Sequence, residues 1–138
     1  LDVLLVYEVR DGRIYRVWSA WHDGTEGDAG PIERQMAAYN AKDLEAFLEP
    51  YARNVELRLL TTGAPLARGT DFLRGAYGPR FEQASDLRAE TLDRIVLGDL
   101  VASHERITDG RGDASESIDI YVLGEDGIQL VWFLIPER

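Results

Sequence analysis

The chain begins with two short segments that are rich in β-branched and aromatic residues. Residues 2–9 (DVLLVYEV) and residues 13–21 (RIYRVWSAW) flank the dipeptide Asp11-Gly12. An Asp-Gly pair between two such segments is typical of the tight turn of a β-hairpin, so we predict a hairpin over residues 1–22. Residues 23–30 follow with glycines, acidic residues and no apolar period, which indicates a flexible linker and a boundary.

Over residues 31–48 the apolar spacing becomes helical. Pro31 suits the first turn of a helix, and three apolar residues share one side at 3.6-residue spacing: Ile32, Met36 and Tyr39. Residues 40–42 interrupt this pattern. Asp43 can then cap a second helix, whose apolar residues are Leu44, Phe47 and Leu48. The pattern predicts two short helices.

A strand and a third helix come next. Residues 55–60 (VELRLL) alternate apolar and polar positions, the period of a half-buried strand, and residues 63–69 are expected to form a loop. Thr70 is a plausible cap for the third helix. Pro79 is expected to limit the regular part of that helix, because proline cannot donate a backbone hydrogen bond.

The last third of the chain reads as a series of strands joined by tight turns. Apolar-rich segments lie near 88–97, 100–108, 115–123 and 128–135, and the turns between them are marked by Gly98-Asp99, Asp109-Gly110 and Asp126-Gly127. Such spacing is typical of an antiparallel meander. Helices followed by strands indicate an α+β fold with the helices on one face of a curved sheet.

The final strand is apolar on both of its alternating sets. One set consists of Ile128, Leu130, Trp132 and Leu134, and the other of Val131, Phe133 and Ile135. A sheet with one face in water would show polar residues in one set. We therefore expect something to cover the second face of the sheet.

The first hairpin resembles the last one in sequence. With a shift of 114, residues 4–18 (LLVYEVRDGRIYRVW) lie over residues 118–132 (IDIYVLGEDGIQLVW). Identical residues then meet at four positions: Tyr7 with Tyr121, Ile14 with Ile128, Val17 with Val131 and Trp18 with Trp132. Shared β-rich composition is one explanation. A remnant of a tandem copy is another, and a hairpin kept to pair with or cover a partner chain is a third.

Length and charge narrow the classes of function. The 138 residues fit one ordinary domain, and there are no cysteines. A formal net charge of −10 without a basic stripe argues against nucleic acid as a partner. No apolar run approaches the ~18 residues of a membrane span, and no secretion signal is visible, so we expect a cytoplasmic protein. Because the first residue is Leu1 rather than Met, the alternatives of a fragment and a processed chain stay open.

Three stretches together resemble the nuclear transport factor 2-like superfamily, with SnoaL-like and ketosteroid isomerase-like domains as the nearest members. They are PIERQMAAYNAKDLEAFLEPYARNVEL, RGTDFLRGAYGPRF and YVLGEDGIQLVWF, and the similarity covers about residues 31–135 in the same order. The resemblance implies a curved antiparallel sheet wrapped around about three helices, which forms a cone with an apolar pocket. It also implies a homodimer formed through the sheet, and the hairpin of residues 1–22 suggests hairpin exchange between subunits. The domain is expected over residues 31–138.

The resemblance also assigns chemistry to single positions. The related isomerases use an aspartate base, a tyrosine on the first helix and a second, protonated aspartate. Matching the motifs puts Leu59 at the base position, Gln35 at the tyrosine position and Asp119 at the second aspartate. Leu59 has no proton to exchange, so ordinary ketosteroid isomerisation is not expected. In the first hairpin Leu5 stands where Asp119 stands in the last, which marks Asp119 as a candidate functional residue.

Asp119 has two candidate partners on the neighbouring strand. In the segment VASHERIT, His104 and Arg106 share one face, whereas Ser103 and Glu105 share the other. The resemblance puts the His104 face inside the cone, where His104 and Asp119 could transfer protons and Arg106 could hold a ligand. A purely structural His-Asp or Arg-Asp pair is the alternative.

Other residues are expected to line the pocket, although aromatic residues at such spacing also suit a plain core. The candidate ligand-binding residues are Gln35, Tyr39, Leu57, Leu59, Arg106 and Trp132, with Phe72 and Tyr77 as further aromatic candidates. We expect no metal and no other cofactor. His22 and His104 are the only histidines, and neither a phosphate-binding glycine loop nor a GxSxG motif is present.

Three functions stay open on these grounds. The first is a domain that binds a small apolar or aromatic molecule in the cone. The second is an isomerase-, cyclase- or hydratase-type enzyme that uses His104 and Asp119. The third is a non-catalytic assembly domain in which the first hairpin completes another subunit.

Overall fold

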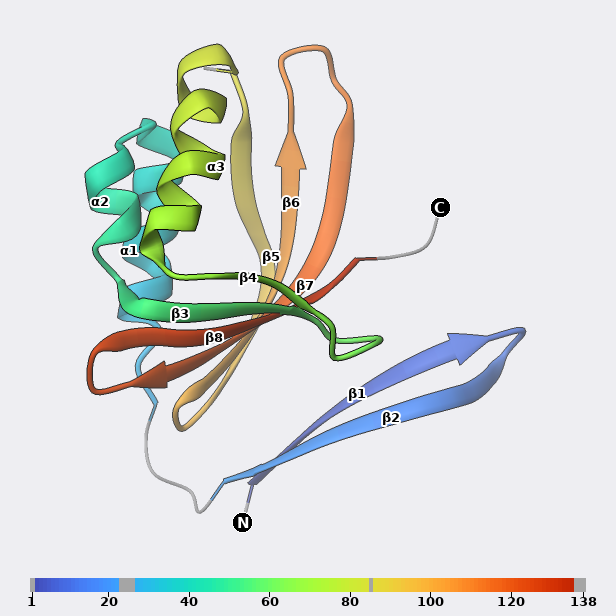
Figure 1. Ribbon diagram of the computed structural model, residues 1–138. Coiled ribbons are helices and arrows are strands. Elements are labelled where there is room, and N and C mark those ends of the chain that lie inside the picture. Colours follow the sequence, from blue (N-terminus) through green and yellow to red (C-terminus); the bar gives the residue numbers. More distant parts are fainter. Residues whose placement is uncertain (1, 23–26, 85, 136–138) are drawn as a thin grey trace.

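The computed structural model describes residues 2–22, 27–84 and 86–135 (Figure 1). The elements in chain order are β1 (Asp2–Arg10), β2 (Arg13–His22), α1 (Gly30–Ala41), α2 (Leu44–Leu48), β3 (Tyr51–Leu59), β4 (Pro65–Arg68), α3 (Thr70–Gln83), β5 (Arg88–Leu97), β6 (Leu100–Thr108), β7 (Ala114–Gly124) and β8 (Gly127–Leu134). The predicted α+β class is confirmed, as are the hairpin and the four-strand meander. Part of the predicted linker, residues 23–26, lies outside the described residues.

The large sheet contains six strands in the order β4-β3-β8-β7-β6-β5. Its pairings are antiparallel except between β3 and β8, which run parallel, so the sheet is mixed rather than purely antiparallel. Figure 1 shows that it is strongly curved, with the three helices on one side and the hairpin β1–β2 on the other. None of the helices in the described part of the chain is long and apolar enough to cross a membrane.

Apolar residues fill both sides of this sheet. The core between the sheet and the helices, which we call the helix-side core, is built around Ile32, Phe47, Val55, Leu73, Val101, Tyr121, Ile128 and Val131. The core between the sheet and the hairpin, the hairpin-side core, contains Leu4, Leu60, Leu97, Ala102 and Ile120, with Trp18, Ile118 and Trp132 packed against them. The expected cover of the second sheet face is therefore the chain's own hairpin.

A β-bulge changes which way the start of β8 faces. The pairing of β7 with β8 shifts register between Val122 and Leu123, and Leu123 then pairs with Ile128. Ile128 is consequently fully buried in the helix-side core. The strict alternation that grouped Ile128 with Trp132 was wrong there, because a bulge inserts one extra residue and exchanges the two faces.

Helix ends follow local chemistry only in part. The predicted cap is confirmed at α2, where the Asp43 side chain accepts a hydrogen bond of 3.1 Å from the backbone N–H of Ala46. At α3 the expected cap is wrong, since Thr70 is already helical and Gly69, with φ of 88°, precedes it. Pro79 lies inside α3 instead of ending it. The buried ring of Phe81 beyond it packs against the aromatic residues of α1 and α2, which holds the last turn in place.

The segment predicted as a loop over residues 63–69 contains a short strand, β4. Its residues Pro65 and Arg68 pair with β3 at the edge of the sheet. Pro65 is the first residue of this edge strand, a position where the missing backbone N–H costs little. The four-residue strand is too short for its apolar alternation to be recognised in the sequence.

Candidate functional site

A cavity of about 270 Å³ lies between the helices and the facing side of the sheet. Four tyrosines from both layers contribute to its walls: Tyr39, Tyr51, Tyr77 and Tyr121. Its polar residues include Gln35, Arg80, Glu105, Ser117 and Asp119. We call this space the cone cavity.

Strand pairing brings the two acids of the cavity together. Asp119 pairs with Ser103 across β7 and β6, and Ser117 pairs with Glu105 two positions further along. Because side chains at every second position share a face, Asp119 and Glu105 are diagonal neighbours on the helix-facing side. Asp119 is 5% exposed and Glu105 is 6% exposed. The cavity therefore has a pair of buried carboxyl groups in its wall.

Of the two acids, Glu105 has a defined hydrogen-bond partner. The hydroxyl of Tyr121 donates a hydrogen bond of 3.0 Å to Oε1 of Glu105. Tyr121 is itself buried, and burial raises the pKa of its phenol well above the usual value. The phenol therefore keeps its proton and remains a hydrogen-bond donor to Glu105.

Asp119 lies in an environment that favours its neutral form. Burial raises the pKa of this carboxyl well above the usual value, and the nearby negative charge of Glu105 raises it further. Hydrogen bonding with Glu105 raises this pKa as well, whereas the side chains of Ser117 and Tyr121 lower it by smaller amounts. The Oδ1 atom of Asp119 is buried and has no hydrogen-bond partner. A protonated carboxyl here can donate one hydrogen bond into the cavity.

The tyrosines of the cavity are also held as neutral donors. Gln35 Nε2 donates a hydrogen bond of 3.0 Å to the Tyr51 hydroxyl. Burial raises the pKa of Tyr51 well above the usual value and raises the pKa of Tyr77 to about 12. Oε1 of Gln35 and the hydroxyl of Tyr39 are buried without a partner. Buried polar atoms without partners are rare in proteins, and several around one cavity indicate a place for a ligand or water.

His104 and Arg106 do not join Asp119, contrary to the expected cluster. Ser103 and Glu105 are buried on the helix-facing side of β6, so the alternation sends His104 to the opposite side, where it pairs with Ile118, which packs against the hairpin-side core. Arg106 forms an ion pair of 2.7 Å with Glu116 at the surface. The arrangement inferred from the resemblance was wrong because it reversed the two faces of this strand.

The other candidate residues divide between the two sides of the sheet. Gln35 and Tyr39 lie at the cone cavity as expected, and so does Tyr77. Leu57 is buried in the helix-side core, Leu59 is half-buried in β3, and neither lines the cavity. Phe72 is 52% exposed.

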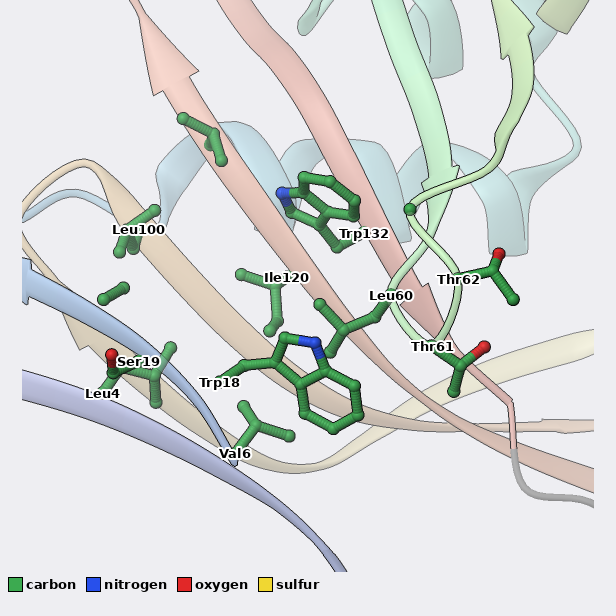
Figure 2. Close-up of a pocket in the computed structure, with 13 residues that line it drawn as sticks. Leu4, Val6, Trp18, Ser19, Leu60, Thr61, Thr62, Leu100, Ile120 and Trp132 are labelled. Carbon is green, nitrogen blue, oxygen red and sulfur yellow. The ribbon is translucent and has the colours of Figure 1, made fainter. Parts of the chain in front are cut away.

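Trp132 faces a different space. It lines an apolar groove of about 480 Å³ between the sheet and the hairpin, which we call the groove. Figure 2 shows Trp18 of β2 in this groove beside Leu60 and Ile120. The predicted role of Trp132 in the cone is therefore not supported by its position.

Sequence reasoning missed several residues of the site, among them Glu105, Tyr51 and Tyr121. A signal for Glu105 was present in its own strand. Val101 and Ile107 share its face, whereas the opposite face carries His104 and Arg106. The more apolar face of a half-buried strand is the one expected inside. That alternation alone would have placed Glu105 in the cone.

Among residues 2–22, 27–84 and 86–135, no group of three or more His, Cys, Asp or Glu side chains is placed to hold a metal ion. The chemistry available at the cone cavity is that of a carboxyl whose pKa is raised by burial, a second acid and several phenols. Such a set can donate hydrogen bonds to an oxygen atom and can pass a proton between two carboxyl groups.

Comparisons with known proteins give a family and a fold. The model of the SnoaL-like domain matches residues 32–131. An uncharacterised cystatin-fold protein from Novosphingobium aromaticivorans superposes with a TM-score of 0.69 at 19% identity, over 80% of this chain and 99% of that chain. A SnoaL-like protein of unknown function from Burkholderia thailandensis gives a TM-score of 0.61 at 20% identity, over 76% of this chain and 90% of that chain.

A third solved structure, from Sinorhizobium meliloti, is provisionally described as a polyketide cyclase. It gives a TM-score of 0.62 at 17% identity, over 75% of this chain and 93% of that chain. No protein of curated function matches the sequence. Identities this low show a shared fold and leave the activity open. On the strength of the family match, the chain belongs to the SnoaL-like domain family.

Proposed function

We propose that the cone cavity binds a small, neutral, apolar or aromatic molecule through one oxygen atom that accepts a hydrogen bond from Asp119. The observation that carries this proposal is the buried carboxyl of Asp119, a residue of the cavity wall whose Oδ1 atom has no hydrogen-bond partner. Leaving such an atom unsatisfied costs about 1–3 kcal/mol. A ligand oxygen at that place would remove the cost.

The walls support a molecule that is mostly apolar. Tyr39, Tyr77 and Phe133 present ring surface, and Ile107 adds aliphatic surface. Pockets for small molecules typically combine such walls with a few polar groups that fix the orientation of the ligand. The volume of about 270 Å³ limits the ligand to a small molecule.

The acid pair supports a neutral ligand over an anion. A carboxylate on the ligand would lie near Glu105, and like charges in a buried site repel each other strongly. A ketone, phenol or enol oxygen brings no charge and can accept the proton of Asp119 in a hydrogen bond. We therefore expect discrimination between a ketone and a carboxylate of the same shape.

Matched probes test this proposal directly. The neutral 2-acetylnaphthalene and the anionic 2-naphthoate share a ring system and a carbonyl group, and calorimetry with amide chemical shifts measures and locates their binding. We expect the ketone to bind at least about tenfold more tightly, a difference of about 1.4 kcal/mol. Equal affinities, shifts confined to the groove near Trp18, or no binding of either probe would contradict the proposal.

Two substitutions at Asp119 test whether the ligand requires a hydrogen-bond donor at this position or the carboxyl group itself. Asp119→Asn keeps an N–H donor of similar size, so the ketone should bind within a few-fold of the wild-type affinity. Asp119→Leu removes the donor and should weaken binding at least about tenfold. Leucine is a suitable control because the matching position of the first hairpin is Leu5. Unchanged affinity in Asp119→Leu would remove Asp119 from the binding site.

An enzyme of the isomerase or cyclase type is the second candidate, and the acid pair favours it. Burial raises the pKa of Asp119 and favours its protonated form next to Glu105, which accepts one hydrogen bond from Tyr121, so the pair could give and take protons on a bound substrate. The similarity to a structure described as a polyketide cyclase is consistent with such chemistry. His104 lies on the other side of the sheet, so Glu105 takes its place in this candidate mechanism. Turnover that survives in Asp119→Asn would count against it.

A further inference from the structure

The two hairpins of this chain share their pairing as well as their sequence. Tyr7 pairs with Val17 in the first hairpin, and Tyr121 pairs with Val131 in the last, as the shift of 114 requires. The same shift relates all the remaining residue pairs that the two hairpins have in common.

The irregularity is shared too. The register of the first hairpin shifts between Glu8 and Val9, and that of the last shifts between Val122 and Leu123, again 114 residues apart. Common β-rich composition explains matching residue types, but it does not place a bulge at the same position. Bulges are specific local features of a sheet. The two hairpins are therefore the same structural unit, present twice.

The two hairpins face each other across the groove, and each contributes apolar residues from one of its faces. The first hairpin contributes Leu4, Val6, Trp18 and Ala20, and the last contributes their equivalents Ile118, Ile120, Trp132 and Leu134. Figure 2 shows members of both sets on the two sides of the groove. Equivalent faces thus meet across an approximate internal symmetry, as in an interface between two copies of one domain.

The remaining faces differ sharply in exposure. In the first hairpin Leu5, Tyr7 and Val17 are 40%, 47% and 51% exposed. Their equivalents in the last hairpin are 5%, 2% and 1% exposed, because the helices cover them. We call the exposed face of β1–β2, formed by Val3, Leu5, Tyr7 and Val17, the outer face. An exposed apolar face of this kind marks an interaction site.

We propose that the outer face is the helix-facing side of a second cone, completed by a cone body that precedes residues 2–22 in the same polypeptide. By cone body we mean helices and strands equivalent to those from α1 to β6. The order of elements supports this partner, because the described cone also ends with its hairpin. The free edges of β1 and β2 support it as well, since the same edges of β7 and β8 pair with β6 and β3.

A fusion protein tests the proposal on the whole chain. Residues 27–114 are joined directly to Leu1, so that Leu1 takes the place of Ser115 and the spacing to the hairpin is kept. If the hairpin completes the added cone body, the helical circular dichroism per molecule rises about twofold, because α1, α2 and α3 are present twice. Hydrogen exchange at the amides of residues 4–7 and 16–19 should slow more than about tenfold.

Two controls keep the result interpretable. A fusion of residues 27–138 ahead of Leu1 supplies the added cone body with its own hairpin and shows that the body folds in this position. The first fusion with Tyr7→Asp and Val17→Asp places charges on the outer face and should leave the added body unfolded. In the 138-residue chain the same two substitutions should change stability little, because both positions are exposed.

The proposal fails if the 27–114 fusion gains no helical signal, or aggregates, while the 27–138 fusion folds. It also fails if the added body folds equally well with Tyr7→Asp and Val17→Asp. Unchanged exchange at the hairpin amides in a folded fusion would likewise overturn it, because the outer face would then be uncovered.

Discussion

The two hairpins place the same fold position in two different environments. In the last hairpin this position is Asp119, which is buried next to Glu105 at the cone cavity, and in the first it is Leu5, which is half-exposed. The pairing around both residues is the same. The comparison shows that the hairpin folds with an apolar residue at this position. The acid is therefore not needed to form the strand, which is consistent with the role in the cavity that we propose for it.

The largest expected effect concerns the helix-facing side of the last hairpin, compared with the outer face of the first. Val131→Asp puts a charge into the helix-side core, where Val131 is 1% exposed, and should cost about 3–5 kcal/mol in the free energy of unfolding. Val17→Asp at the equivalent position of the first hairpin should stay within about 0.5 kcal/mol. Urea unfolding measures both. Equal costs would mean that the outer face is already covered in the 138-residue chain.

A smaller effect is expected at Asp119 itself, and it depends on pH. The folded-state pKa of Asp119 is raised, so its proton stabilises the fold below the unfolded pKa of about 4, and this contribution is lost as the pH rises toward the folded pKa. Asp119→Leu lacks the effect. The stability of the variant relative to wild type should therefore increase from about pH 4 upward, by at most about 1.4 kcal/mol per pH unit.

Denaturant unfolding at a series of pH values measures this difference, and Leu5→Asp is its matched counterpart. That substitution creates an exposed acid, whose contribution should not vary with pH in this way. A stability difference between Asp119→Leu and wild type that stays flat across the pH series would mean that Asp119 is ionised in the folded protein.

The smallest effect is expected on the far side of β6. His104 is partly exposed, and its Nε2 atom lies 3.8 Å from Oε1 of Glu116. Such surface pairs contribute about 0–1 kcal/mol to the free energy of unfolding. His104→Ala should leave the affinity for 2-acetylnaphthalene unchanged, whereas Asp119→Leu weakens it. Titration calorimetry on both variants provides the comparison. A loss of affinity in His104→Ala would show that the two sides of the sheet are coupled.

The sequence predicted the meander well because glycine-aspartate turns and period-2 alternation mark strands locally. It also led to Asp119, through the family resemblance and the contrast with Leu5. The pairing of Glu105 with its neighbours could not be predicted in the same way, because the register between β6 and β7 is a non-local property. The bulge at Val122 and the continuation of α3 through Pro79 likewise depend on packing against residues distant in the chain.

The bulge in β7–β8 also determines which residues of the hairpin face each of the two cores. Gln129 is the extra residue, because Ile128 pairs with Leu123 and Leu130 pairs with Val122. Residues on the two sides of the bulge follow opposite alternations, so the bulge decides which face of the sheet each of them joins. Deleting Gln129 would leave the composition of the hairpin almost unchanged but would force Ile128 out of one core or Trp132 out of the other. The orientation of Asp119 toward the cone cavity thus depends on the length of the strand opposite it.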